Sequence, residues 1–206
     1  MRTDTIETFL EQLATRVPAP GGGATAALHA AQAAALVAMV ARYSDSAKFA
    51  DHAEEIATIT STADRLRHNA LGLAEEDAAA FTAVTEAYRL PKGTPDEAAA
   101  RSEAIATSLV AAARVPAVVV AVADQVLGLA EQLLPIGNRN VVSDVAAAAE
   151  AARAAATTAR VNVEVNLGGI KDPATWGELA AAVDTVDDLA VRAEKVTAAV
   201  RDGLVR

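Results

Sequence analysis

Apolar residues along this chain recur at spacings of three and four, the period of an α-helix, and no convincing period-two run indicates a strand. Short segments rich in proline, glycine or asparagine interrupt the pattern and divide the chain into helices. The sequence predicts helices over residues 4–15, 21–43, 51–89, 95–116, 116–134, from just before 143 to 165, and from 173 to 201.

The clearest helix start is the sequence Thr94-Pro95-Asp96-Glu97. Thr94 is a suitable N-cap, Pro95 suits the first helical position, and Glu97 completes a capping box. Asp4 and Glu7 have the same spacing at the start of the first helix, with Asp in place of the usual Ser or Thr.

Proline and glycine set the remaining boundaries. We expect Pro116 to end or kink the fourth helix, because proline lacks a backbone N–H and clashes with the preceding turn. Residues 116–122 also have strand propensity, but the apolar run continues without a turn and a lone strand would have no partner, which favours helix. Gly72 is a weak point within the third helix, and Gly203 is an end signal for the last.

The composition fits an all-α fold, a single domain of long packed antiparallel helices over residues 1–206. Hydrophobic residues make up 52% of the chain but aromatic residues only 3%, so the apolar content is mainly Ala, Val and Leu. Small side chains let helices approach closely. A core of many small contacts gains from further burial between subunits, and we therefore expect a homodimer.

Charge and cysteine content exclude several classes of protein. A net charge of −9 argues against a nucleic-acid binder, which needs a basic patch. The absence of Cys excludes disulfides, a thiolate nucleophile and Cys-based metal sites. The first residues lack the apolar core of a signal peptide, and the apolar run 24–41 contains His29 and Gln32, so we interpret it as a buried soluble helix. The expected location is the cytoplasm, without a membrane partner.

The turn Pro18-Ala19-Pro20-Gly21-Gly22-Gly23 leads directly into a helix. Glycines allow positive φ and expose the backbone N–H groups of the helix start, which can hold an electron-rich ligand group. The alternative interpretation is a tight turn that lets two helices pack closely.

Asp77 and Phe81 are four residues apart in a helix and share one face, among alanines that indicate partial burial. A buried carboxylate needs a partner or its pKa rises. The alternative is that Asp77 is a solvated helix residue.

Further polar residues stand where an Ala-rich bundle does not need them. Asn162 and Asn166 are four apart within an apolar helix, where their amides need partners. A second group, Asn138, Asn140 and Asp144, lies at a loop-to-helix junction, where either Asn can instead act as a cap. Lysines in or beside loops can hold an anionic ligand tail or remain solvated: Lys48, Lys92 and Lys171.

Several familiar sites are excluded. His29, His52 and His68 have no metal-ligand spacing, so no metal is expected. The glycine turn is not followed by the Lys of a phosphate-binding loop, and no strand–glycine–helix fingerprint for nicotinamide binding is present.

Five segments together resemble the cyclodeaminase/cyclohydrolase family, which includes the cyclodeaminase domain of formiminotransferase-cyclodeaminase and bacterial methenyltetrahydrofolate cyclohydrolases. The resemblance spans essentially the whole chain. Its motifs, in order, are Pro18-Ala19-Pro20-Gly21-Gly22-Gly23, Asp77-Ala78-Ala79-Ala80-Phe81, Leu90-Pro91-Lys92, Gly137-Asn138-Arg139-Asn140-Val141-Val142-Ser143-Asp144 and Asn162-Val163-Glu164-Val165-Asn166-Leu167.

This resemblance implies a helical dimer that binds a tetrahydrofolate derivative near the glycine turn, with no cofactor beyond that substrate. It implies either closure of 5-formiminotetrahydrofolate with loss of ammonia, or hydration of 5,10-methenyltetrahydrofolate to 10-formyltetrahydrofolate. For such chemistry we expect Asp77 or Asp144 to transfer protons. The expected substrate-binding residues are Gly21, Gly22, Gly23, Lys48, Phe81, Lys92, Asn138, Asn140, Asn162 and Asn166.

One position departs from the resemblance. Relatives commonly carry Ser directly after the glycines, where this chain has Ala24. Thr25 is then a candidate to supply the hydroxyl. The departure keeps a second hypothesis open, a non-catalytic folate-binding helical dimer. A purely structural bundle is the third, although it leaves the glycine turn and the Asn162/Asn166 pair unexplained.

Overall fold

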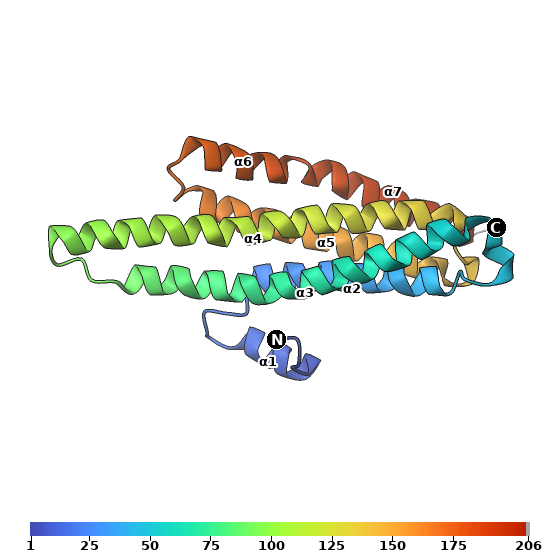
Figure 1. The fold of residues 1–206 in the computed structure, drawn as a ribbon, viewed down its shortest axis with the longest axis horizontal. Coiled ribbons are helices and arrows are strands. Elements are labelled where there is room, and N and C mark those ends of the chain that lie inside the picture. The colour runs from blue at the N-terminus through green and yellow to red at the C-terminus, as the bar shows by residue number, and fades with distance from the viewer. Residues whose placement is uncertain (205–206) are drawn as a thin grey trace.

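The computed structural model describes residues 1–204, and it is helical over most of that length (Figure 1). No strand occurs within these residues, which confirms the all-α class and excludes a strand at 116–122. The helices are α1 (Ile6–Ala14), α2 (Gly22–Arg42), α3 (Ala53–Arg89), α4 (Pro95–Ile136), α5 (Val142–Leu167), α6 (Pro173–Asp184) and α7 (Val186–Leu204), with the short 3-10 helices η1 (Ala47–His52) and η2 (Arg139–Val141).

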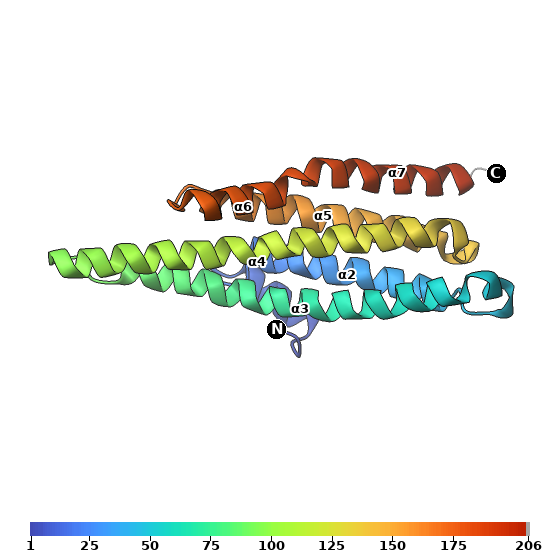
Figure 2. The ribbon, with the colours of Figure 1, turned by 45° about the horizontal axis from the view of Figure 1, so that its top comes forward.

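Four long helices, α2 to α5, form an elongated bundle, and α6 and α7 fold back along α4 and α5 (Figures 1 and 2). Helix α2 packs against α3, α4 and α5. Its buried residues are mainly alanines, so the neighbouring helices can approach its backbone closely. The core is thus built from many small contacts, as the composition predicts.

Helices α2 and α4 are long and apolar enough to cross a membrane when only length and composition are considered. Most of α2 is buried inside the bundle, which is equally typical of a core helix. The prediction that residues 24–41 form a buried helix is confirmed, and the prediction that no membrane is involved stays a prediction.

Two helix boundaries differ from the predictions. Helix α4 continues through Pro116, which is buried within the bundle. Packing on both sides of this residue therefore outweighs the roughly 3 kcal/mol that a proline costs inside a helix. The last helix is divided at Thr185 into α6 and α7, and α7 is described to Leu204, one residue beyond Gly203.

Of the two predicted N-caps, that of α4 is confirmed and that of α1 is wrong. Thr94 and Glu97 form the predicted capping box of α4. At α1, however, the cap is Thr5, whose hydroxyl accepts a hydrogen bond from the N–H of Thr8 at 3.1 Å. The prediction of Asp4 as cap is wrong because the helix starts one residue later, and Asp4 instead pairs with the N-terminal ammonium at 3.5 Å.

Candidate active site

The glycine turn brings the first turn of α2 against α3. Gly21 is the N-cap in an extended conformation, and no glycine within residues 1–204 has a positive φ, so the expectation of positive φ in this turn is wrong. A Cβ on Gly23 would lie 2.0 Å from Oδ1 of Asp77. Glycine is required at position 23 because the carboxylate of α3 occupies the space of a side chain.

The Asp77 carboxylate accepts a hydrogen bond from the backbone N–H of Ala24. This N–H belongs to the first turn of α2, where donors have no partner within the helix and carry partial positive charge. Burial raises the pKa of the Asp77 carboxyl above its ordinary value, and the hydrogen bond from Ala24 opposes this in part. Asp77 is therefore not a solvated helix residue but a part-buried carboxylate with increased proton affinity.

Asp77 faces a cavity of about 130 Å³ that also has Asn162 and Asn166 in its wall. The amide of Asn162 donates to the carbonyl of Thr158 at 2.8 Å, and that of Asn166 donates to the carbonyl of Asn162 at 2.7 Å. Each amide keeps a second N–H and its carbonyl oxygen for a ligand. The cavity thus presents one carboxylate and two amides to a small polar group.

The rim of this cavity is apolar. Phe81 is 47% exposed and Val165 is 75% exposed. Typical ligand pockets measure roughly 300 to 1,000 Å³, so the cavity encloses only part of a drug-sized ligand, and the rest lies over these exposed side chains. Pro18 and Ala19 complete the wall beside the glycines.

Sequence reasoning missed part of this wall. Pro18 and Ala19 line the cavity but are not among the predicted binding residues, and their place beside the three glycines in the same motif is the signal that points to them. Val165 stands between the two asparagines. Ala112 of α4 gives no signal, because an alanine in an Ala-rich helix has no distinguishing chemistry.

The other predicted site residues lie away from this cavity. Asn138 is the N-cap of η2 and Asn140 lies within it, at the far end of α2, where the N–H of Asn138 donates to Oγ of Ser44 at 2.9 Å. Its side-chain amide donates to the carbonyl of Tyr43 at 2.8 Å, and its Oδ1 accepts from the N–H of Asn140. Asn138 therefore acts as a cap, but of the short helix η2; the N-cap of α5 itself is Val141, so the prediction that an asparagine caps that helix is wrong.

Asp144 begins α5, whereas Asn162 and Asn166 lie near its end, and this helix of 26 residues is roughly 39 Å long. Lys48 lies in η1, Lys92 in the turn between α3 and α4, and Lys171 in the loop between α5 and α6. None of them lines the Asp77 cavity. Their proposed roles stay predictions.

The Thr25 hydroxyl donates to the carbonyl of Gly21 at 2.9 Å and does not line the Asp77 cavity. Ala24 is fully buried, so it contributes its backbone N–H and not its side chain. Within residues 1–204, no cluster of three or more His, Asp or Glu side chains could hold a metal ion.

Comparison with known proteins identifies the family. Residues 5–185 match the family model described as formiminotransferase-cyclodeaminase. The chain belongs to the formiminotransferase-cyclodeaminase family. The resemblance carried by the five sequence motifs is thereby confirmed.

Two relatives illustrate the breadth of the formiminotransferase-cyclodeaminase family. A methenyltetrahydrofolate cyclohydrolase of Methylorubrum extorquens is 40% identical over 172 residues, which is 83% of each chain. The formimidoyltransferase-cyclodeaminase of Mus musculus is 34% identical over 171 residues, which cover 80% of this chain but only 30% of the mouse protein.

A solved structure in the same family has the same fold. The crystal structure of formiminotetrahydrofolate cyclodeaminase from Thermotoga maritima matches with a TM-score of 0.86 and 27% identity, over 100% of this chain and 99% of that one. The bundle described above is therefore the fold of that enzyme.

Proposed function

We propose that this protein is a tetrahydrofolate-dependent enzyme of one-carbon metabolism that hydrates the methenyl bridge of 5,10-methenyltetrahydrofolate to give 10-formyltetrahydrofolate. The observation that carries the proposal is the Asp77 carboxylate, held against the first turn of α2 in a cavity with two asparagine amides. The similarity to the Methylorubrum cyclohydrolase, over 83% of both chains, supports hydration as the reaction.

Asp77 is the proton-transfer group in this proposal. Water adding to the bridging carbon must lose a proton, and a carboxylate whose pKa is raised by burial is a better base than an ordinary one. The negative charge of the Asp77 carboxylate also favours binding of the cationic methenyl group over binding of a neutral group. The raised pKa later helps the same group return this proton to N5 as the bond between N5 and the bridging carbon breaks, while the hydroxyl proton on that carbon is released to solvent and the formyl carbonyl forms on N10.

The two asparagines orient the ligand. The unused amide groups of Asn162 and Asn166 match the carbonyl and N–H edges of a pterin, and Phe81 offers an apolar surface at the cavity rim. Holding the bridge carbon beside the Asp77 carboxylate lowers the reaction barrier, because the reacting atoms are already correctly oriented.

A second reaction, closure of 5-formiminotetrahydrofolate with release of ammonia, is favoured by the structural match to the Thermotoga cyclodeaminase. It passes through the same tetrahedral carbon between N5 and N10. Asp77 would then accept the proton of the attacking N10, with no change in the cavity.

The oligomeric state, location and cofactor needs of the protein are part of the proposal. We propose a homodimer in the cytoplasm that needs neither metal nor nicotinamide and does not bind a membrane. The part-apolar surface of the bundle and its small-residue core support association between subunits. Chelator treatment that abolishes activity, with recovery on adding a divalent ion, would refute the metal-free part.

The test offers methenyl- and formiminotetrahydrofolate separately to purified protein and follows methenyl absorbance. We expect turnover of at least one, and a loss of at least tenfold in kcat for Asp77→Asn. Asp144→Asn is assayed in parallel. Full activity in Asp77→Asn, or loss in Asp144→Asn alone, overturns the assignment of Asp77, and binding of both folates without turnover supports the non-catalytic folate-binding dimer.

A further inference from the structure

Helix α1 is separated from the bundle by a cavity that its own side chains help to form (Figures 1 and 2). This α1 cavity measures about 350 Å³ and lies between α1, the first half of α2 and the middle of α3. Typical ligand pockets measure roughly 300 to 1,000 Å³. The space is therefore large enough for a small molecule, and it shares no wall residue with the Asp77 cavity.

Two facing sides of the α1 cavity are apolar. One side is the apolar face of α1, and the other belongs to α2 and α3. The main apolar wall residues are Ile6, Phe9, Leu10 and Leu13 on the first side and Leu28 and Leu71 on the second. Protein interiors are close-packed, and side chains that line a gap lose dispersion contacts. A molecule with two apolar faces restores those contacts when it lies between the two sides.

The charged residues at the edge of the α1 cavity are already paired. Nε of Arg2 donates to Oε2 of Glu75 at 2.9 Å, and the backbone N–H of Arg2 donates to Oε1 of Glu75 at 3.2 Å. The carboxylate of Asp4 lies 3.5 Å from the N-terminal ammonium. An ion therefore finds no unpaired Asp or Arg in this wall within residues 1–204, which favours an uncharged occupant.

Two polar side chains in the wall are available to a ligand. His29 is half-buried and Gln32 is exposed, and neither side chain forms a hydrogen bond within residues 1–204. They are three residues apart on α2, so they are neighbours on one face of the helix. Thr25 also lines the cavity, but its hydroxyl already donates to the carbonyl of Gly21 at 2.9 Å.

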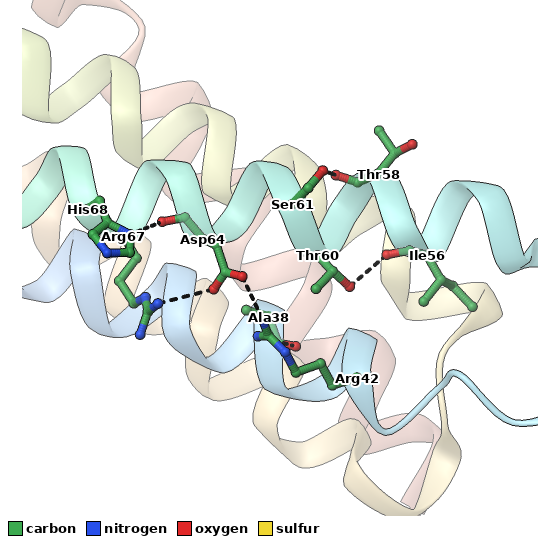
Figure 3. Close-up of polar contacts among 9 residues, drawn as sticks. All are labelled: Ala38, Arg42, Ile56, Thr58, Thr60, Ser61, Asp64, Arg67 and His68. Carbon is green, nitrogen blue, oxygen red and sulfur yellow. Dashed lines mark hydrogen bonds and ion pairs between the residues drawn. The ribbon is translucent and has the colours of Figure 1, made fainter.

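Farther along the same two helices, polar side chains pair with each other instead. Arg42 of α2 and Arg67 of α3 both pair with Asp64, as Figure 3 shows, and Nη2 of Arg67 lies 3.2 Å from Oδ1 of Asp64. At the α1 cavity, by contrast, α3 contributes only apolar residues to the wall. The two polar side chains of α2 therefore face the cavity without a protein partner.

We propose that the α1 cavity binds a small uncharged ring compound with an amide-type edge, that is, an N–H beside a carbonyl. A planar ring system has the two apolar faces that the facing walls require. The primary amide of Gln32 has both donors and an acceptor, so it pairs with such an edge through two hydrogen bonds, and the imidazole of His29 lies beside it. The site does not depend on the proposed folate chemistry.

Titration calorimetry of the wild-type protein with three bicyclic probes tests the ligand chemistry. Quinolin-2-one has the amide-type edge, indole has an N–H without a neighbouring carbonyl, and quinoline-2-carboxylate is an anion. We expect saturable binding of quinolin-2-one, binding of indole weaker by about three- to tenfold because a hydrogen bond is lost, and the weakest binding for the anion. No saturable binding of quinolin-2-one, or equal or tighter binding of either other probe, overturns the proposal.

A substitution at Gln32 tests the polar contact. Gln32→Leu removes the amide at an exposed position, so the bundle is expected to fold as before. We expect the Kd for quinolin-2-one to rise about fivefold or more, and the Kd for indole to change less. Gln125→Leu is the matched control, because Gln125 is an exposed glutamine of α4 outside the cavity. Equal effects of the two substitutions on quinolin-2-one binding overturn the proposed contact.

Two further variants locate the probe. Leu28→Trp fills the α1 cavity and should abolish binding of quinolin-2-one, with circular dichroism as the check that the helix content is unchanged. Asp77→Asn alters the other cavity and should leave this binding unchanged. Binding that persists in Leu28→Trp, or that is lost in Asp77→Asn, overturns the assignment of the site. Neither result bears on the turnover of folates, which is measured separately.

Discussion

Asp77 accepts a backbone N–H at the start of α2, a role that usually belongs to the side chain of the helix's own N-cap residue. The cap position is Gly21, which has no side chain, and the carboxylate that accepts the N–H of Ala24 comes from α3. This contact adds to the extensive packing of α2 against α3. It also leaves the carboxylate at the wall of a cavity, where a group for proton transfer is needed.

The raised pKa of Asp77 predicts how stability varies with pH. The folded state holds this proton more tightly than the unfolded state, so the contribution of Asp77 to the free energy of unfolding falls as pH rises from the ordinary carboxyl pKa through the raised one. Asp77→Asn keeps an acceptor for Ala24 and removes this fall. In urea denaturation, we expect the free energy of unfolding of Asp77→Asn to equal or exceed that of wild type at about pH 7. Relative to wild type, it should decrease toward about pH 4. A constant difference at all pH values would contradict this.

Close approach at Gly23 gives a second prediction. Gly23→Ala places a methyl group onto the Asp77 carboxylate, so we expect a loss of roughly 1–3 kcal/mol in stability from overpacking. We also expect weaker folate binding, measured by fluorescence titration. Gly177→Ala in α6 is the matched control, since no atom lies within 4 Å of its added Cβ and the residue does not line the Asp77 cavity. An unchanged folate affinity in Gly23→Ala, as in the control, would show that Gly23 serves only the packing of the turn.

At the residue scale the sequence identified the cavity in large part. The glycine turn, Asp77, Phe81 and the asparagine pair do meet. The glycines are explained by a close contact between helices and not by the predicted positive φ, and such a contact depends on residues far apart in sequence. The same limit applies to Asn138 and Asp144, whose place in a shared motif does not reveal their distance in space.

At the scale of elements, the hydrophobic periodicity predicted the positions of the helices well and their boundaries less well. Pro116 is a helix breaker by its own chemistry, but burial on both sides keeps α4 continuous. Conversely, Thr185 separates α6 from α7 without a proline or glycine to indicate it. Local signals thus decide boundaries only where tertiary packing does not oppose them.

The capping box of α4 gives a prediction at this scale. Thr94→Ala removes the hydroxyl that accepts from the N–H of Glu97 at 3.2 Å, and we expect a loss of about 1 kcal/mol in chemical denaturation. Activity should be unchanged, because this turn lies away from the Asp77 cavity. Thr58→Ala, an exposed position within α3, is the control and should be nearly neutral. A loss no larger than that of the control would show that tertiary contacts alone hold this helix start.

At the scale of the whole molecule, the outer helix α7 packs a buried apolar face against the bundle, and Arg192 adds ion pairs from α7 to α4. Its guanidinium donates to both carboxylate oxygens of Glu131, at 3.0 and 2.7 Å, and to Asp124 of the same helix α4 at 2.5 Å. Hydrophobic periodicity shows which face of α7 is buried but not which helix it meets. The order of packing, and the separation of α1, therefore emerge only from the structure.

We expect Arg192→Met to lower the free energy of unfolding by about 1–2 kcal/mol, because it leaves two carboxylates without their shared cation. The difference from wild type should shrink at high salt, which screens the repulsion and the attraction alike. Arg153→Met, which removes an ion pair within the single helix α5, should cost no more than about 0.5 kcal/mol. Equal effects of the two substitutions would refute a fastening role for Arg192.

The cap that Asp77 provides has a mechanical consequence. A protonated carboxyl accepts a hydrogen bond more weakly than a carboxylate. In the proposed reaction, each proton taken up by Asp77 therefore weakens this one contact between α3 and the start of α2, and each proton returned restores it.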